Sequence, residues 1–480
     1  MPLVPIALAS SSNRTRFRQE GNARLLNCYV EQIGEEGKHP WVIYADDGVV
    51  PFATLLNGDD IRASLPVGST LYVVSGRNVY ATDLSGTGTL LGSIATDGLV
   101  TMAANRKQPN PQIGIVCGGL YYVIENNNLT QVNDPDLPPP LMLFERDGYF
   151  IFPIRDGRFY YSGINDALSI DGLDFASAES RADPNVTGAT RGTDNVIFGT
   201  QTMEFFANTG DADAPFQRHQ SMNIGCYSAG SVSEITAVIN GSTVDSIIWA
   251  ATDEQGAYNG VMLLNGYAGM KISTHAVDRA IQNEPLPQNI RAYSWSDKGH
   301  VFYEISGTTW TFIYDTVNGT VNGTWHDGES YGFSRRRFST YARYASKHIF
   351  GDFETNRLYA KNEVIGTEAG EPLVCVVQTP PVHATPFKLQ FHTLYVDVIV
   401  DDNAAWSGPN PVLMVDYSDD GAVTWKTQRL IDVGPQGQRT RRVKTARLGS
   451  ARSRTFRFSW NDPRIKGIGN AQADVEQLVA

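Results

Sequence analysis

Residues 299–315, GHVFYEISGTTWTFIYD, indicate the fold class of this chain. Two runs rich in aromatic and β-branched residues, HVFYEI and WTFIYD, flank the short polar segment SGTT. Residues of these types are enriched in β-strands, and two such runs around a short Gly-containing turn predict a β-hairpin. The segment therefore predicts two antiparallel strands joined by a tight turn.

Similar hairpins recur along most of the chain. They occupy residues 71–83, 113–128, 148–163, 195–207, 246–266, 299–315 and 347–362. Successive runs begin 35 to 53 residues apart, which is near the period of roughly 40–50 residues for one β-propeller blade. The pattern predicts an all-β chain with an irregular β-propeller-like domain, although a set of stacked sandwiches would give similar spacing.

Two changes in this rhythm suggest domain boundaries. Residues 1–60 contain few strand patterns and predict an N-terminal arm with one early strand. The proline-dense segment TPPVHATP (379–386) ends the repeats. The strands after it alternate with a period of two, so we expect a propeller-like domain at 61–378 and an antiparallel β-sandwich at 379–480. One helix is predicted at 272–283, with Ser273 or Thr274 as N-cap and Ala276, Ala280 and Ile281 on one side.

The composition narrows the possible classes of protein. Hydrophobic residues make up 41% of the 480 residues, which is enough for a large core. The four cysteines, at positions 28, 117, 226 and 375, are widely separated and predict buried, reduced thiols. No run approaches the ~18 apolar residues that a membrane helix needs, so no membrane insertion is expected.

Charge is unevenly distributed along the chain. The net charge is −12, but residues 426–466 hold twelve Lys and Arg against two Asp, which leaves −22 for the rest. A basic segment of this kind can bind nucleic acid, bind an acidic partner subunit or form a solvated strand face. The candidate docking residues are Arg439, Arg441, Arg442, Lys444, Arg447, Arg452, Arg454 and Arg457.

Motifs of enzymes and cofactor sites are absent from the sequence. There is no phosphate-binding loop, HExxH motif, GxSxG elbow or dinucleotide fingerprint, and the eight histidines are scattered. We therefore predict no catalytic residues, cofactor or metal site. The segment SDDGAVTW (418–425) is similar to the hairpin-turn box of sialidase propellers, but that box carries no catalysis. Arg335, Arg336 and Arg337 are adjacent, so they cannot all converge on one carboxylate.

Residues 195–332 carry a recognisable order of motifs. Phe-Gly-x-x-Thr-x-Glu-Phe is followed by Gly-Cys, Ile-Ser-Thr-His-Ala-Val, Thr-Trp and a final tryptophan. This order resembles the packaged-DNA stabilisation proteins of short-tailed bacteriophages, the tail hub or tail accessory factor family. The matched residues are Phe198, Gly199, Thr202, Glu204, Phe205, Gly225, Cys226, Trp249, Ser273, His275, Trp310 and Trp325.

The resemblance implies a structural role without catalysis. A family member is expected to form a hexameric ring that docks beneath the portal-adaptor ring, extends the DNA exit channel and retains packaged DNA. The ring would receive a tail needle, carry tailspikes or fibres, and let double-stranded DNA pass transiently. The protein is then expected in the virion tail, after assembly in the bacterial host cytoplasm. The matched residues would be framework positions, with Gly199 in a turn or close backbone approach and Thr202 and Glu204 bonding across a sheet end. The core would be filled by Phe205, Phe206, Trp249, Trp310 and Trp325.

The charge pattern is compatible with this role. Each phosphate that a protein neutralises adds salt-dependent affinity for DNA, so an acidic channel wall would let DNA slide. The basic C-terminal stretch would then dock an acidic partner ring. Two alternatives remain open at this point: a glycan-binding or glycan-cleaving propeller, and a clamp that binds DNA directly through the basic C-terminus.

Overall fold

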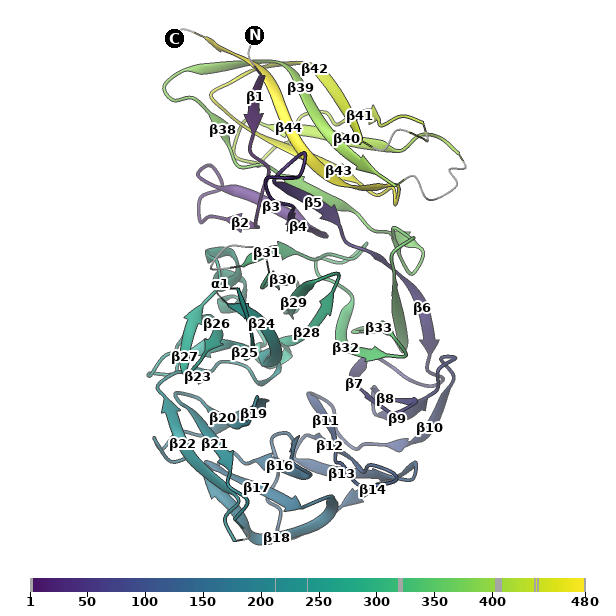
Figure 1. Ribbon diagram of the computed structural model, residues 1–480, viewed down its shortest axis with the longest axis vertical. Helices are drawn as coiled ribbons and strands as arrows, with labels where there is room; N and C mark the ends of the chain where they lie inside the picture. Colours follow the sequence, from purple (N-terminus) through teal and green to yellow (C-terminus); the bar gives the residue numbers. More distant parts are fainter. Residues whose placement is uncertain are drawn as a thin grey trace.

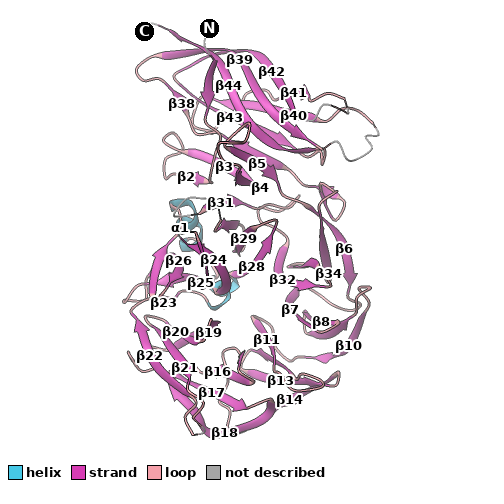
Figure 2. Cartoon of the chain, in the orientation of Figure 1, coloured by secondary structure: helices cyan, strands magenta, loops and turns pink. Residues whose placement is uncertain are grey.

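The computed structural model describes residues 3–211, 213–239, 241–317, 323–401, 408–435, 437 and 440–478. Within these residues the protein is almost entirely β-structure (Figure 2). A ring of sheets carries a two-sheet sandwich on its rim, and both chain ends lie in the sandwich (Figure 1). The prediction of a propeller-like domain followed by a C-terminal sandwich is therefore confirmed.

The ring contains seven four-stranded antiparallel blades in the described part of the chain. The first four blades are β7 (Ile61–Val67), β8 (Thr70–Ser75), β9 (Asn78–Thr82) and β10 (Gly88–Ser93); β11 (Val100–Ala104), β12 (Ile113–Cys117), β13 (Leu120–Glu125) and β14 (Asn128–Val132); β15 (Phe144–Arg146), β16 (Tyr149–Pro153), β17 (Arg158–Gly163) and β18 (Asp166–Ser177); and β19 (Asn185–Arg191), β20 (Asp194–Gly199), β21 (Met203–Asn208) and β22 (Phe216–Met222).

The last three blades complete the ring, and the fifth and seventh of them carry additional short strands. The three blades are β24 (Ser233–Ile239), β25 (Ser242–Thr252), β26 (Tyr258–Asn265) and β27 (Ala268–Lys271), with β23 (Gly225–Cys226) beside β25; β28 (Arg291–Asp297), β29 (His300–Ser306), β30 (Thr311–Asp315) and β31 (Thr324–Asp327); and β32 (Phe338–Tyr344), β33 (Lys347–Asp352), β34 (Arg357–Asn362) and β6 (Gly48–Thr54). The short strands β35 (Thr367–Glu368) and β36 (Glu371–Pro372) extend the seventh blade.

The first strand of every blade faces the middle of the ring. These strands, β7, β11, β15, β19, β24, β28 and β32, follow one another around a closed circle. They line a central cavity of about 310 Å³. The hairpins recognised in the sequence begin at or near the second strand of each blade. The repeat could be recognised because the second and third strands are buried between neighbouring blades and are therefore rich in apolar residues.

An N-terminal strand closes the ring. The seventh blade takes three strands from residues 338–362, and β6 supplies the fourth by pairing antiparallel with β34. The predicted N-terminal arm therefore differs from the structure, because residues 3–45 join the sandwich and β6 belongs to the propeller. The sequence could not show this, since the partners of these strands lie hundreds of positions later in the chain.

The sandwich is built from both ends of the chain. One sheet contains β4 (Cys28–Gln32), β5 (Trp41–Ala45), β44 (Ile465–Leu478), β39 (Lys388–Val400) and β42 (Thr440–Ala451), with β1 (Leu3–Ile6) on β44. The other contains β3 (Asn22–Leu26), β37 (Cys375–Gln378), β43 (Ser453–Trp460), β40 (Val412–Ser418) and β41 (Arg429–Asp432), with β2 (Asn13–Arg14) on β3 and β38 (Val382–His383) on β43. Apolar side chains from both sheets form one core. Because β37 already pairs with β43, the sandwich begins a few residues before the predicted boundary.

One continuous sheet joins the sandwich to the ring. Strand β31 of the sixth blade runs parallel to β3, with Leu26 opposite Asp327, and β3 pairs in turn with β37. The Arg24 Nε atom lies 2.6 Å from Asp327 Oδ2 across this joint, and Arg14 also contacts that carboxylate. Hydrogen bonds and buried charge therefore fix the two domains relative to each other.

A second set of ion pairs holds the strand that crosses from the sandwich to the ring. Asp46, between β5 and β6, accepts a hydrogen bond from Arg336 Nη2 at 2.8 Å. Lys361 of β34 lies 2.6 Å from Asp297 and 3.2 Å from Asp47. Burial alone would raise the pKa of Asp46, but the charges of Arg336 and Lys361 lower it far below its ordinary value. The crossing is therefore fixed by charges from the last two blades.

The described part of the chain holds one α-helix, α1 (His275–Gln282), and two 3₁₀ turns, Ala229–Ser231 and Pro287–Asn289. Helix α1 begins slightly later than predicted, with Thr274 as N-cap residue but without a side-chain capping bond. Its buried face consists of Val277 and Ile281, and it connects the fifth and sixth blades. The predicted apolar side is therefore only partly correct, since Ile281 alone of the three named residues is fully buried.

Closing the ring through β6 predicts a face-specific effect of mutation. Ala53 is buried against Leu358 in an apolar cluster, whereas its neighbour Thr54 is exposed. Ala53→Asp should lower the free energy of unfolding by about 3–5 kcal/mol, because the carboxylate would be buried without a partner. Thr54→Asp, on the other face of the same strand, should change it by less than about 0.5 kcal/mol. Urea denaturation of both variants checks this, and equal losses would contradict the assignment of faces.

Candidate functional site

The side chain of Asp183 organises one end of the fourth blade. Its Oδ2 atom accepts hydrogen bonds from the backbone N–H groups of Gln201 and Thr202 at 2.7 and 3.1 Å. The Thr202 hydroxyl donates to Oδ1 at 2.8 Å. A Cβ atom on Gly199 would lie only 2.2 Å from Asp183 Oδ2. Gly199 is therefore required by the close approach of a side chain, since its own φ is not positive.

Glu204 lies buried in the next strand, β21, and binds groups outside that strand. Its Oε1 atom accepts the backbone N–H of Ser180 at 2.8 Å, and its Oε2 atom accepts Arg218 Nη1 at 2.8 Å. The carboxylate is thus satisfied by one backbone donor and one partly exposed cation. Together with the Asp183 cluster, these contacts give the matched polar residues a structural role in the described part of the blade.

Aromatic residues of the matched pattern fill the core between the fourth and fifth blades. Phe198, Phe205 and Trp249 are fully buried in one cluster that also contains Cys226. The Trp249 Nε1–H group donates to the carbonyl of Gly225 at 3.0 Å. The indole is therefore both a packing element and a hydrogen-bonded link between strands β25 and β23.

The remaining matched residues lie around helix α1. Trp325 is buried, and its Nε1–H group donates to a backbone carbonyl at 2.7 Å. Trp310 is only half-buried and donates to Glu284 Oε2 at 3.0 Å, so it does not fill the core as completely as expected. The Ser273 hydroxyl accepts a backbone N–H group from β26, and His275 is exposed at the first helical position.

Arg454 is not available for docking, which corrects that prediction. Its side chain is 1% exposed and lies 2.7 Å from Asp419 through Nε. The guanidinium also stacks over the rings of Tyr417 and Phe391, with centroid distances of 4.0 and 4.6 Å. Arg454 therefore belongs to the sandwich interior, where its charge is paired and its plane is packed between aromatic rings.

Two further candidates are paired with carboxylates on neighbouring strands. Arg457 binds Asp416 through two hydrogen bonds, and its guanidinium lies over the ring of Trp425 at 3.9 Å. Arg442 likewise binds Asp397 through Nε and Nη2. Burial alone would raise the pKa of Asp397, but the bond from Arg442 lowers it below its ordinary value. Much of the positive charge counted in the sequence is therefore compensated inside the sandwich.

Three candidates remain as exposed cations. Lys444, Arg447 and Arg452 are exposed along β42 and the turn that follows it, and none lies within 4 Å of a carboxylate in the residues that the structure covers. We call them the β42 cations. Arg441 is half-buried and donates to the carbonyl of Val433 at 2.8 Å. Arg439 lies outside the described residues.

The carboxylates that compensate the basic stretch were missed because they lie outside it in sequence. Asp416 is directly opposite Arg457 in the β40–β43 register, and Asp397 is opposite Arg442 in the β39–β42 register. Opposite charges at facing positions are a recognised cross-strand pair. Pairing the predicted sandwich strands would therefore have found these two ion pairs from sequence.

The structure adds no sign of a catalytic or metal centre to the described residues. No group of three or more His, Cys, Asp or Glu side chains is arranged to hold a metal ion there. The SDDGAVTW segment forms a turn in which Asp420 accepts the backbone N–H groups of Val423 and Thr424. The four cysteines are free and buried, as the sequence predicted. None of the described helices has the length and apolar character needed to cross a membrane.

Comparison with known protein families identifies the family to which this chain belongs. The family described as Bacteriophage P22 Gp10, β-propeller, matches residues 45–364, and the family described as Bacteriophage P22 Gp10, β-sandwich, matches residues 378–476. The chain belongs to the P22 Gp10 family. The resemblance found in residues 195–332 is thereby confirmed, and the P22 Gp10-like chain is a structural tail protein of a bacteriophage.

Likenesses to individual proteins are weaker. No curated protein sequence matches the P22 Gp10-like chain. Among solved structures, the WD40 β-propeller domain of Doa1 has 12% sequence identity and a TM-score of 0.41, covering 66% of this chain and 97% of that one. The computationally designed Ika8 protein has 13% identity and a TM-score of 0.36, covering 65% of this chain and 100% of that one.

The Asp183 cluster predicts a specific loss of stability. Asp183→Ala removes the acceptor for two backbone N–H groups and one hydroxyl, and should lower the free energy of unfolding by at least about 2 kcal/mol. Asp83→Ala is a matched control, because exposed Asp83 also accepts two backbone N–H groups and one hydroxyl. The control should lose less, since water can replace an exposed acceptor. Equal losses in guanidinium denaturation would contradict the importance of burial.

Because Arg454 is buried and Arg452 is exposed, their replacement should affect stability differently. Arg454→Ala should destabilise the protein by about 2–5 kcal/mol, because it would empty the space between Tyr417 and Phe391 and leave the buried carbonyl of Leu448 without its donor. Arg452→Ala should change stability by less than about 0.5 kcal/mol, since that side chain is exposed. Thermal unfolding of the two variants measures the difference. Similar midpoints for both variants would argue against a structural role for Arg454.

Proposed function

We propose that this protein is the hub of a short-tailed bacteriophage tail, which extends the portal-adaptor channel and retains packaged DNA. The family match over both the propeller and the sandwich carries this proposal. In the proposed assembly the chain forms a closed hexameric ring and offers attachment for a tail needle and for tailspikes or fibres. Its role is positional and involves no catalysis.

The joint between the two domains supports a positional role. A continuous sheet and the Asp327 ion pairs connect the sixth blade to the sandwich. A hub subunit has to hold surfaces for different partners at fixed separations while DNA is under pressure. A rigid joint of this kind suits that task better than a flexible linker, because relative motion of the domains would change the distances between the surfaces that bind different partners.

The β42 cations are the surface that we assign to an acidic partner ring. Lys444, Arg447 and Arg452 are exposed and lack carboxylate partners in the described residues. Complementary charge guides the register and rate of association between subunits. The rest of the chain outside residues 426–466 has a charge of −22, which favours a wall along which DNA slides.

The alternative of a direct DNA clamp has less support. Arg442, Arg454 and Arg457 are each paired with a carboxylate, so fewer cations are free to neutralise phosphates than the sequence suggested. A clamp would depend on those phosphate contacts for its affinity. The glycan-cleaving alternative is also weakened, because the sialidase-like segment forms only a turn in the sandwich.

Charge reversal of the β42 cations tests the docking role. Phage particles assembled with a Lys444→Glu, Arg447→Glu, Arg452→Glu variant should contain at least about tenfold less of the chain, because like charges at an interface cost several kcal/mol. A matched control reverses three exposed propeller cations, Arg155, Lys347 and Arg357, and should assemble normally. Quantitative immunoblotting of purified particles gives the ratio.

Two results would contradict the proposal. Normal incorporation of the β42 variant would show that these cations do not dock the partner ring. Steeply salt-dependent binding of duplex DNA by the wild-type chain near physiological salt, lost in the β42 variant, would favour the clamp instead.

A further inference from the structure

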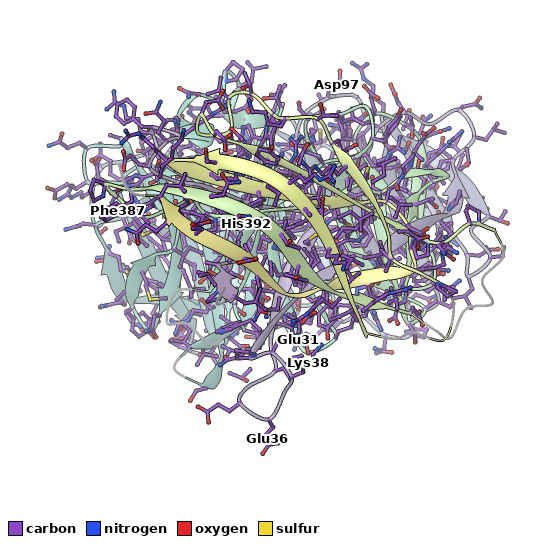
Figure 3. All side chains as sticks on the ribbon, turned by 90° about the horizontal axis from the view of Figure 1, so that it is seen from above. Glu31, Glu36, Lys38, Asp97, Phe387 and His392 are labelled. Carbon is purple, nitrogen blue, oxygen red and sulfur yellow. The ribbon has the colours of Figure 1, made fainter. Side chains whose placement is uncertain are left out.

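Three arginines gather at one mouth of the propeller ring. Arg62 stands at the start of β7, Arg291 is the first residue of β28, and Arg335 precedes β32. All three line one cavity of about 490 Å³ between the first, sixth and seventh blades. Asp97, which lines the same cavity, lies on the opposite side of the molecule from Glu36 (Figure 3).

None of these guanidinium groups lies within 4 Å of a carboxylate in the described residues. Neutral carbonyl groups hold them instead. Arg335 donates to the carbonyls of Gly307 and Phe338 at 2.8 and 3.0 Å, and Arg62 donates to that of Gly98 at 2.7 Å. The neighbouring Arg336, by contrast, is paired with two carboxylates. The fold therefore fixes the positions of three cations whose contacts in the described residues are mainly to backbone carbonyls and not to carboxylates.

The charges of these residues influence one another. Burial lowers the pKa of Arg291, and the nearby charges of Arg62 and Arg335 lower it further. Two acidic residues also face the cavity, Asp60 and Asp97. Asp97 is engaged by Arg77 at 2.5 Å, and the charge of Asp60 acts on Arg291. Outside the cavity lining, the charges of Glu304, Glu284 and Asp352 act on Arg335. Among the residues that line the cavity, three arginines face two acids.

Two N–H-bearing groups of Arg291 have no acceptor in the described residues. Its Nη1 atom donates to the carbonyls of Gln288 and Ile290 at 2.7 and 2.9 Å. Its Nε and Nη2 groups make no hydrogen bond within the described residues. Arg62, by contrast, uses its nitrogens on backbone carbonyls and the Cys117 sulfur, so it contributes charge more than free donors.

We propose that this mouth of the ring binds the phosphate group of a small ligand, with Arg291 as the direct donor and Arg62 and Arg335 as supporting charges. A guanidinium presents a planar set of N–H donors that matches the oxygens of a phosphate group. The cavity volume lies within the range of about 300–1,000 Å³ for small-molecule sites, so a ligand larger than free phosphate also fits. This site is separate from the β42 cations and does not depend on the hub proposal.

Titration of the full-length chain with inorganic phosphate tests the proposal, with ³¹P NMR and calorimetry at constant ionic strength. Wild-type protein should bind phosphate saturably, with a dissociation constant at or below about 1 mM. Arg291→Gln should weaken binding at least tenfold, while Arg155→Gln, which changes an exposed arginine that does not line the cavity, should leave it within about twofold. Thermal stabilisation is not the readout, because phosphate stabilises many proteins without binding.

A second variant protects the test against loss of folding. Asn289 is exposed and lines the cavity, so Asn289→Asp should fold normally yet weaken phosphate binding by adding a negative charge. Absence of saturable binding to the wild type would overturn the proposal. Equal binding by the wild type, Arg291→Gln and Asn289→Asp would also overturn it. If acetate competed as well as phosphate at equal concentration, the assignment to phosphate would be wrong.

Discussion

The pairing of β6 with β34 is the constraint on which the rest of the structure depends. A ring of sheets is stable only if its last blade is completed, and here an early strand completes it. Because β6 is the outermost of the four long strands of the seventh blade, the chain before it emerges at the rim of the ring. The strands β1 to β5 are therefore placed where they can join the C-terminal strands in one sandwich. The same chain path therefore closes the ring and assembles the sandwich.

Ion pairs also hold the region in which the chain crosses from the sandwich to the ring. Asp46, Arg336 and Lys361 surround the crossing from sandwich to ring, and Asp327 joins the sixth blade to β3. Buried ion pairs of this kind contribute little net stability but strongly disfavour arrangements that leave one charge alone. In the sandwich, the buried guanidinium of Arg454 pairs with the exposed carboxylate of Asp419. Arg24, Arg336 and Arg454 therefore help to fix the geometry, whereas other arginines, such as Arg447 and Arg452, are exposed.

Much of the fold could be predicted from the sequence, and the reasons are local. The propeller repeat was visible because each second strand, such as His300–Ser306, is buried and rich in aromatic and β-branched residues. The pairing of β6 with β34 could not be predicted, because the sequence pattern of β6 does not show that its partner strand lies near residue 360. Local charge counting also overstated the basic surface, because Arg442 and Arg457 face acids on strands outside the counted segment. The three arginines at the ring mouth are far apart in sequence, so only the closed ring brings them together.

The central claim is that this chain is a structural subunit of the phage tail. Quantitative mass spectrometry of purified virions, with the capsid protein as internal standard, tests it most directly. The account predicts a fixed small number of copies in every particle, about six if the subunits form one closed hexameric ring. Absence of the protein from purified virions would contradict the account, whatever the chain binds in solution.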